Sequence, residues 1–246
     1  MKVSVALGIP HAPWRSERIV SYRRLASQLL ENVSIELAGH RVFADREPNY
    51  SWSAKLWQWA VDTGATHLLQ LQDDVIVAPN FWSHLGRMLE GVPNGVIGLE
   101  AVHPNVANVT GCWYKTYDCL IGVGYVVPTT LLRDFLEWRS KLRKGAIESV
   151  SEDTLLGVWC MVTDHGVWHP VPTIVDHDVD LPSTYGNDAH GHRKPLVTWQ
   201  DRPVTMCWKP VGVPNLGRFY EATPRLARRW IVGATEEGYQ RWMEMR

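Results

Sequence analysis

The chain has 246 residues and a formal net charge of −1 at pH 7, a length that allows one substantial core. The balanced charge argues against a globally basic nucleic-acid binder and against an acidic, solvating chain, so a charged partner must be met by a local patch. No stretch approaches the ~18 apolar residues of a membrane helix, and the apolar run after Lys2 is too short for a signal peptide. We therefore expect a soluble, cytoplasmic protein without a membrane segment.

Strands and helices alternate in the pattern of the first hundred residues. The first predicted strand stops at Pro10, and a loop from His11 to Arg15 leads into the first helix. Gly64 ends the second helix and Pro79 starts the third. The predicted elements here are strands at residues 3–9, 33–37, 40–44 and 67–72 and helices at 17–31, 52–63 and 80–89.

The alternation continues to about residue 170. We predict strands at 96–99 and 120–127 and helices at 128–142 and 152–163, the last with Ser151 as its N-cap. A polar segment rich in Pro, His, Asp and Gly follows to Pro195, then short strands and a helix at 235–245. Alternation of this kind implies an α/β sheet with right-handed crossovers.

Two carboxylates follow the strand at residues 67–72, which closes in Gln72, Asp73 and Asp74. Ligands of open α/β sheets bind at the carboxyl ends of the strands. Adjacent carboxylates in a loop suit Mg²⁺ or Mn²⁺, which in turn neutralises a diphosphate. The alternative is that one of the two acids only caps the helix that begins near Pro79.

A second pair of acids, Glu152 and Asp153, stands at the N-terminus of a predicted helix. The helix dipole favours their ionised form there. An ionised acid within reach of a hydroxyl can act as its general base. Helix capping is the alternative function of this pair.

His177 ends the short apolar segment at residues 172–175 and has Asp176 and Asp178 as neighbours. A neutral imidazole can complete a metal site begun by Asp74, with a neighbouring carboxylate fixing its tautomer. The alternative is an ordinary histidine in a polar loop.

In their order and spacing these segments resemble the GT-A glycosyltransferases, most closely the small bacterial and phage members near families 2 and 25. The resemblance covers about residues 1–190. Its motifs are a first strand ending near Pro10, an apolar strand closing in Gln72-Asp73-Asp74, the Glu152-Asp153 pair followed by Leu155-Leu156-Gly157, the segment Pro172-x-x-Val175-x-His177, and Ser183-x-x-Gly186.

The resemblance implies the GT-A fold, which is a Rossmann-like nucleotide-diphospho-sugar transferase fold of the α/β class with a mixed central sheet flanked by helices. It also implies one catalytic domain over residues 1–246. About residues 1–110 would bind the nucleotide sugar, about 111–195 would carry the acceptor and catalytic groups, and 196–246 would form a C-terminal extension.

The resemblance assigns the metal site as well. The last acid of the D-x-D motif ligates the metal in such enzymes, which makes Asp74 the ligand of Mn²⁺ or Mg²⁺ and His177 its late partner. Asp73 would lie near the ribose or the sugar. Gln72 stands where an acid is usual, so the site has one charge fewer and is expected to hold a metal well only together with the donor diphosphate.

The loop after the first strand holds the base and ribose in the family, which implies Ile9, Pro10 and His11 as nucleotide-binding residues. Arg15 and Arg18 are candidate partners of the diphosphate because a guanidinium matches phosphate oxygens in pairs. The alternative for both arginines is a solvated helix face.

The catalytic groups follow in the same way. Asp153 matches the acid that deprotonates the acceptor in inverting members, and Glu152 stands beside it. Gly122 and Gly124 would let the backbone approach the donor sugar, although close packing within a strand explains glycines equally well.

These assignments predict a metal-dependent, inverting glycosyltransferase that moves a hexose from a nucleotide-diphosphate sugar, with a UDP-sugar favoured, to an acceptor hydroxyl. The acceptor is a hydroxymethylated pyrimidine in phage DNA, which would place the enzyme in the host cytoplasm, or a glycan or protein hydroxyl. Basic residues near Trp138 and Trp230 suit a nucleic-acid strand, and also suit the charged outer face of a helix. They are Arg133, Arg139, Lys141, Arg143, Lys144, Arg225, Arg228 and Arg229.

Two alternatives remain open at this stage. One is a non-catalytic sugar- or nucleotide-binding module of the same fold that has lost turnover through Gln72. The other is a nucleotidyltransferase, which also uses paired acids and Mg²⁺. Against the second, the N-terminal region has no Gly-rich phosphate loop with a lysine, only Gly8.

Overall fold

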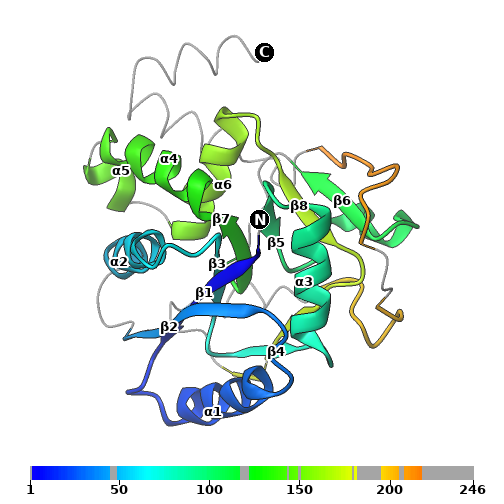
Figure 1. Ribbon diagram of the computed structural model, residues 1–246, viewed down its shortest axis with the longest axis horizontal. Coiled ribbons are helices and arrows are strands. Elements are labelled where there is room, and N and C mark those ends of the chain that lie inside the picture. Colours follow the sequence, from blue (N-terminus) through cyan, green and yellow to red (C-terminus); the bar gives the residue numbers. More distant parts are fainter. Residues whose placement is uncertain are drawn as a thin grey trace.

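The chain is described by a computed structural model for residues 2–44, 49–116, 122–142, 144–148, 151–178, 180–181, 195–204 and 208–217. Its elements alternate between strand and helix for most of this length (Figure 1). They are β1 Ser4–His11, α1 Ser16–Leu30, β2 Glu36–Ala44, α2 Asn49–Asp62, β3 His67–Leu71, β4 Val75–Val77, α3 Phe81–Gly91, β5 Val96–Gly98, a 3₁₀ turn Pro104–Asn108, β6 Trp113–Thr116, β7 Gly124–Pro128, α4 Thr129–Ser140, α5 Lys144–Glu148, α6 Glu152–Val162, β8 Val167–Pro170 and β9 Val175–His177.

The central sheet is mixed. Among the described residues it has seven strands in the order β2-β1-β3-β7-β5-β8-β6. Strand β1 runs parallel to β2 and β3, whereas β7 is antiparallel to both of its neighbours, β3 and β5. Strands β3 and β5 therefore point the same way, and their carboxyl ends lie at one edge of the sheet.

Helices cover both faces of the sheet because successive strand residues point to opposite sides. Val5, Leu7 and Ile9 of β1 pack in one apolar layer with α1 and α3, and Ala6 belongs to the other layer with α2, α4 and α6. The two groups of helices can be followed in Figure 1. The predicted α/β class, with a mixed central sheet flanked by helices, is confirmed.

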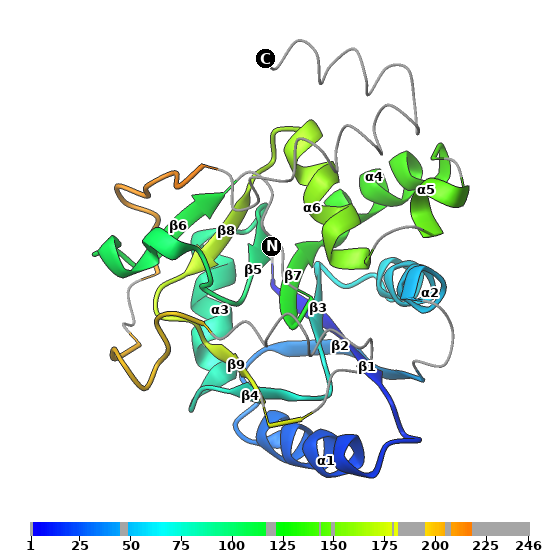
Figure 2. The ribbon, with the colours of Figure 1, turned by 180° about the vertical axis from the view of Figure 1, so that it is seen from behind.

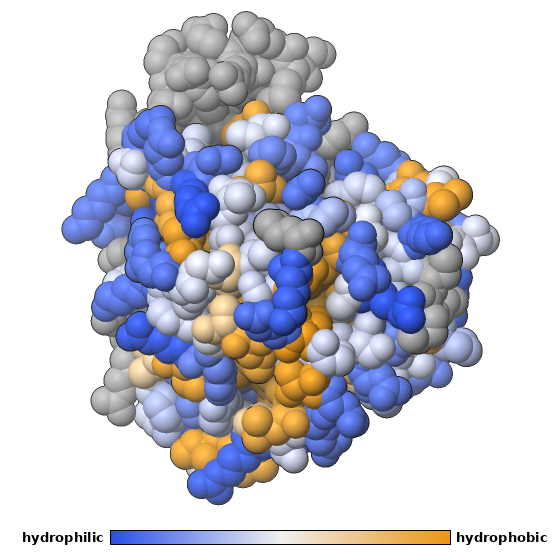
Figure 3. All heavy atoms as spheres, viewed as in Figure 1, coloured by the Kyte–Doolittle hydropathy of each residue, from blue (hydrophilic) through white to orange (hydrophobic). Residues whose placement is uncertain are grey.

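Strand β2 is an edge strand with an exposed face. Leu37 and Val42 each expose 37% of their surface. On the face seen in Figure 3, apolar side chains gather in a band over β2 and α3. No helix in the described part of the chain is long and apolar enough to cross a membrane.

Two of the predicted boundaries were wrong. The expected strands at 33–37 and 40–44 form one strand, β2. Its pairing with β1 continues past a bulge, because Val5 lies opposite Leu37 and Ala6 lies opposite Gly39, which leaves Ala38 as the extra residue. Helix α3 begins after Asn80, which has a left-handed backbone (φ 57°), rather than at Pro79. The helix expected at 235–245 and residues 120–121 lie outside the described ranges.

A short ribbon lies outside the central sheet. Strands β4 and β9 pair in antiparallel fashion, with Val75 opposite His177 and Val77 opposite Val175 (Figure 2). The amide of Asp178 continues this pairing by donating to the carbonyl of Asp74 at 2.9 Å. The ribbon thus joins the end of β3 to a segment about a hundred residues later in the chain.

Candidate functional site

Asp73 and Asp74 form the turn between β3 and β4. The amide of Gln72 donates to the carbonyl of Val123 at 2.9 Å, so the sheet pairing continues one residue beyond β3 before the chain turns. The turn carries both acids into the protein, where Asp73 is 4% exposed and Asp74 is fully buried. We call Asp73, Asp74, Arg18 and His177 the acidic corner.

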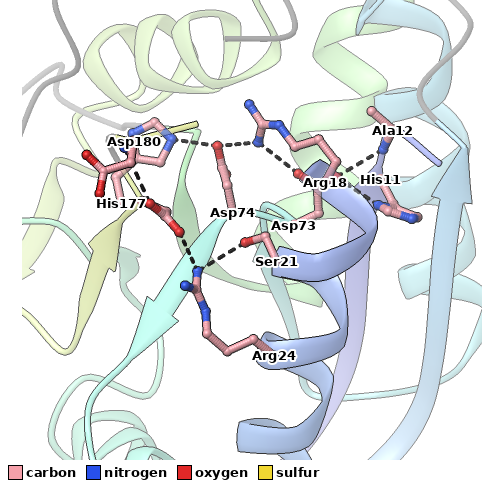
Figure 4. A network of polar contacts seen from close by, with 10 residues as sticks. His11, Ala12, Arg18, Ser21, Arg24, Asp73, Asp74, His177 and Asp180 are labelled. Carbon is pink, nitrogen blue, oxygen red and sulfur yellow. Dashed lines mark hydrogen bonds and ion pairs between the residues drawn. The ribbon is translucent and has the colours of Figure 1, made fainter. Parts of the chain in front are cut away.

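Asp73 ties the loop after β1 to the corner. Its Oδ2 lies 2.8 Å from Nδ1 of His11 and accepts the amide of Ala12 at 3.0 Å, and its Oδ1 accepts Nη1 of Arg18 at 3.0 Å (Figure 4). The ring of His11 stacks on Tyr22 of α1 at 4.7 Å. Asp73 therefore fixes the loop that the sequence assigns to the nucleotide.

Asp74 is bound on one oxygen only. Its Oδ2 lies 2.7 Å from Nε2 of His177 and forms an ion pair with Nη1 of Arg18 (Figure 4). Its Oδ1 is buried and has no hydrogen-bond partner among the described residues. An unpartnered buried carboxylate oxygen is costly. This oxygen is therefore the atom of the corner best suited to meet a ligand.

The corner favours the charged forms of its side chains. Burial raises the pKa of Asp74, but the hydrogen bond and charge of His177 and the charge of Arg18 outweigh it and hold that pKa below its ordinary value. Burial lowers the pKa of His177, but Asp74, with a smaller contribution from Glu100, raises it above its ordinary value. Each of the two groups thus favours the charged form of the other.

A second arginine of α1 approaches the same region. Nη2 of Arg24 lies 2.8 Å from Oδ2 of Asp178 and 3.1 Å from the hydroxyl of Ser21 (Figure 4). Arg18, Ser21 and Arg24 follow one another at intervals of three residues, so they lie along one face of α1. This face connects the helix to β3 through Arg18 and to the end of β9 through Arg24.

The residues of the corner fit a divalent ion that shares its coordination with a substrate. A carboxylate oxygen and an imidazole nitrogen suit Mn²⁺, and Oδ1 of Asp74 is a buried oxygen that still lacks a partner. No group of three or more His, Cys, Asp or Glu side chains in the described ranges is placed to hold an ion. Donor oxygens and water would therefore have to supply most of the coordination, as is usual for ions that bind with phosphates.

Asp153 and Gln72 approach each other from two elements. Oδ2 of Asp153, at the start of α6, accepts the amide of Gly122 at 3.0 Å, and its Oδ1 accepts the amide of Thr154 at 2.9 Å. A Cβ on Gly122 would lie 3.3 Å from Nε2 of Gln72 and 3.4 Å from Oδ2 of Asp153. Both side chains thus lie around one glycine, and a larger residue there would press against the end of Gln72. Ser151 is the N-cap residue, as predicted, although its side chain makes no capping bond.

Glu152 differs from Asp153 in its surroundings. Its side chain is 3% exposed, and its charge contributes to the pKa of Tyr125. Burial is the largest cause that raises this pKa well above its ordinary value. The Tyr125 hydroxyl donates to Oε1 of Gln70 and accepts Nε1 of Trp57 at 3.0 Å. Of the two acids predicted to be catalytic, Asp153 is the partly exposed one and Glu152 belongs to a buried polar group below it.

The other predicted nucleotide contacts have mixed outcomes. The side chains of Ile9 and Pro10 are buried, and Ile9 belongs to the core, so it can meet a ligand only through its backbone. Arg15 precedes α1 and is partly exposed. Gly124 is explained by packing, since a Cβ there would lie 3.0 Å from Leu71. Ser183 and Gly186 of the last motif lie outside the described ranges.

Sequence reasoning named Arg18 as a candidate partner of the diphosphate without predicting its burial, and it missed Glu100. The alternative for Arg18 was a position on the solvated face of the helix, but its side chain is 3% exposed. Its spacing from Leu25 and Leu29 places it on the buried face of α1, and this spacing is visible in the sequence. Glu100 is 1% exposed and follows the end of β5. The same rule for strand-terminal acids that identified Asp74 could have identified it.

Three of the described basic residues that were expected to meet DNA contact other side chains of the protein. Lys141 and Lys144 lie 2.9 Å and 3.5 Å from the glutamates four residues away in each case. The guanidinium of Arg139 lies over the ring of Trp57 at 6.0 Å. Trp138 is partly buried against the core. The other basic residues of this set, except Arg133, lie beyond the described ranges.

Comparison with known proteins finds similarity in structure alone. No protein-family model matches the sequence, and no curated protein sequence matches it. The chain is similar to a viral protein from STIV, with 16% identity and a TM-score of 0.40 over 73% of this chain and 87% of that one. It is also similar to β-1,4-galactosyltransferase 7 of Drosophila in complex with manganese, UDP-Gal and xylobiose, with 16% identity and a TM-score of 0.36 over 54% of this chain and 52% of that one. A further similar structure is TarS of S. aureus, with 11% identity and a TM-score of 0.41 over 98% of this chain and 68% of that one.

Glycosyltransferases and nucleotidyltransferases are both among the similar solved structures, the second class represented by the putative glucose-1-phosphate thymidylyltransferase of Bacillus anthracis. The chain covers only about half of the galactosyltransferase. Similarity of this degree carries no argument about activity. The chemistry must be inferred from the chain's own residues.

Proposed function

We propose that the chain is an inverting glycosyltransferase that moves a sugar from a nucleotide diphosphate to a hydroxyl. The position of Gln72 supports this most. It directly precedes the two buried acids of the corner, and its side chain lies beside Asp153 across Gly122. A direct displacement needs a diphosphate site and a proton acceptor close to each other, and the link from the corner through Gln72 to Asp153 supports that placement.

In the proposed reaction the carboxylate of Asp153 accepts the proton of the acceptor hydroxyl while the hydroxyl oxygen attacks the anomeric carbon. The bond from that carbon to the diphosphate oxygen breaks, and the diphosphate leaves with the electron pair. Attack from the opposite face inverts the anomeric centre. A divalent ion, when bound, would neutralise the leaving diphosphate, and Asp74 and His177 are the residues that would hold it.

The donor in this proposal is a nucleotide-diphosphate sugar, with a UDP-hexose as the first choice from the motif resemblance. The loop at His11 would meet the nucleotide because Asp73 fixes it beside the corner. Arg15, at the start of α1, would meet the diphosphate together with the positive end of the helix dipole.

The acceptor in this proposal is a hydroxyl group. A hydroxymethylated pyrimidine in phage DNA is the acceptor that the motif resemblance suggests, and a glycan or protein hydroxyl is the other class. The ion pairs of Lys141 and Lys144 within their own helices give no support to a DNA track on α4 and α5, so a panel of acceptors must decide.

The test is nucleotide release and product formation. The protein is incubated with Mn²⁺, UDP- or GDP-sugars, and a panel of acceptors that includes hydroxymethylated DNA, glycans and peptides. Asp153→Asn is expected to lower kcat by about 10²–10⁴-fold, the usual contribution of a general base. Asp164→Asn is the matched control, because Asp164 is exposed at the other end of the same helix and asparagine tolerates its left-handed backbone (φ 57°).

The outcomes separate the three functions. Release that is lost in Asp153→Asn and kept in Asp164→Asn supports the transferase. Donor binding without release across the whole panel would instead identify a binding module. Pyrophosphate release from a sugar phosphate and a nucleoside triphosphate would replace the proposal with a nucleotidyltransferase.

A further inference from the structure

Arg18 lies between the two acids of the corner. It belongs to the first turn of α1 and is 3% exposed, and the same nitrogen, Nη1, reaches Oδ1 of Asp73 at 3.0 Å and Oδ2 of Asp74. A guanidinium cannot lose its proton in a protein. The corner therefore holds a permanent positive charge at the place where two carboxylates would otherwise attract a metal.

Arg18 offsets part of the negative charge of the corner. Asp73 and Asp74 are two acids, and the guanidinium of Arg18 contacts both of them. Gln72 adds no charge where the motif usually has an acid. A free divalent ion that approached this corner would therefore meet a weaker attraction than the two acids alone would exert.

We propose that Arg18 is an internal counter-ion that prevents the corner from binding a divalent ion until a nucleotide diphosphate is present, so that metal and nucleotide bind as one unit. This inference rests on the proposed use of a nucleotide diphosphate. The diphosphate brings the negative charge that the corner lacks and supplies oxygen ligands to the ion. Oδ1 of Asp74 is buried and has no hydrogen-bond partner in the described part of the chain, so it is the protein's own oxygen for the ion.

Arg24 is a second arginine by which α1 contacts the same region. It joins this helix to the end of β9 through the side chain of Asp178 at 2.8 Å. This pair is more exposed than that of Arg18, and Asp178 meets Asp74 through the backbone, by the bond from its amide to the carbonyl of Asp74. Arg24→Gln therefore removes one arginine–aspartate pair from the same helix without changing the charge on the two acids, and it is the matched control.

The experiment measures Mn²⁺ binding by electron paramagnetic resonance, with and without UDP and with no sugar or acceptor. In the unmodified protein we expect Mn²⁺ to bind at least about tenfold more tightly when UDP is present. Arg18→Gln is expected to bind Mn²⁺ without UDP at least about tenfold more tightly than the unmodified protein, since a unit charge is removed next to the site. Arg24→Gln is expected to stay within about twofold of the unmodified protein.

A second variant does not depend on removing a buried arginine. Gln72→Glu restores a third acid beside the corner and leaves Arg18 in place, and we expect it also to strengthen Mn²⁺ binding in the absence of UDP. Melting curves establish that each variant is folded. If Arg18→Gln does not fold, Gln72→Glu and the unmodified protein decide the question.

Three results would overturn the inference: equal Mn²⁺ affinity of the unmodified protein with and without UDP, no gain in a folded Arg18→Gln, or no gain in Gln72→Glu when Arg18→Gln does not fold. None of these measurements involves turnover. A protein that transfers no sugar can therefore still show the effect of Arg18, and an active transferase can still lack it.

Discussion

Replacing Asp74 by asparagine tests the acidic corner most directly. The substitution keeps the shape of the side chain and removes its charge. His177 loses its carboxylate partner, and Arg18 loses its contact with Asp74 but keeps the one with Asp73 at 3.0 Å. Hydrogen bonds to charged groups contribute about 1.5–3 kcal/mol each, so we expect a loss of about 3 kcal/mol in the free energy of unfolding. For a chain of this length that corresponds to a fall in Tm of about 6–12 °C.

The effect should depend on pH in a defined way. The pKa of Asp74 is lowered in the folded protein, so its stabilisation is present above the ordinary value of 3.8 and is lost as the pH falls through the folded pKa. The pKa of His177 is raised, so its stabilisation is complete below 6.5 and is lost as the pH rises through the folded pKa. The difference in Tm should therefore be largest between pH 4 and 6.5.

The measurement is thermal unfolding followed by circular dichroism in metal-free buffers from pH 4 to 9. Asp178→Asn serves as the control, because its pair with Arg24 is partly exposed and such pairs contribute about 0–1 kcal/mol. A Tm difference for Asp74→Asn below about 1 °C at pH 6, or one that is the same at pH 6 and pH 9, would refute the reasoning.

Three further predictions concern the core. Tyr125→Phe leaves Oε1 of Gln70 and the indole of Trp57 without their shared partner. We expect the free energy of unfolding in urea titrations to fall by about 2–4 kcal/mol, and an unchanged midpoint would show that these hydrogen bonds do not stabilise the fold. Burial lowers the pKa of His67, so its neutral form stabilises the protein above pH 6.5 and this stability falls as the pH drops. His67→Gln should therefore reduce the decrease in Tm between pH 7 and 5. An equal decrease in Tm in the variant would exclude His67 as the cause of that decrease. A methyl group at Gly91 would lie 2.4 Å from a backbone carbonyl oxygen. Gly91→Ala should lower the free energy of unfolding by about 1–3 kcal/mol in the same titrations. A variant as stable as the parent would show that the backbone there can move.

The parts of the fold that the sequence predicts are those with long patterns. Strand β3 is a continuous apolar run that ends at two acids, so both the strand and the position of Asp73 and Asp74 at its end were predicted. The pairing of Asp74 with His177 was also predicted, and the two side chains lie 2.7 Å apart. The metal that they were predicted to share, and the catalytic role of Asp153, remain predictions.

The parts that were not predicted depend on contacts rather than on pattern. Strands β4 and β9 have three residues each, too few for any periodicity to be visible, and they exist because each is the other's partner. The burial of Arg18 depends in the same way on the acids of a different segment. A single charged residue on an apolar helix face carries no indication of its partner in the sequence.

The short ribbon of β4 and β9 also has a consequence for how this sequence can change. Its register brings Asp74 and His177 together, and a shift of one residue in either strand would turn the imidazole to the opposite face. The central sheet shares no strand with the ribbon and would survive such a shift. Over evolution we therefore expect selection against insertions and deletions within residues 72–78 and 172–178, even where substitutions of their apolar residues are accepted.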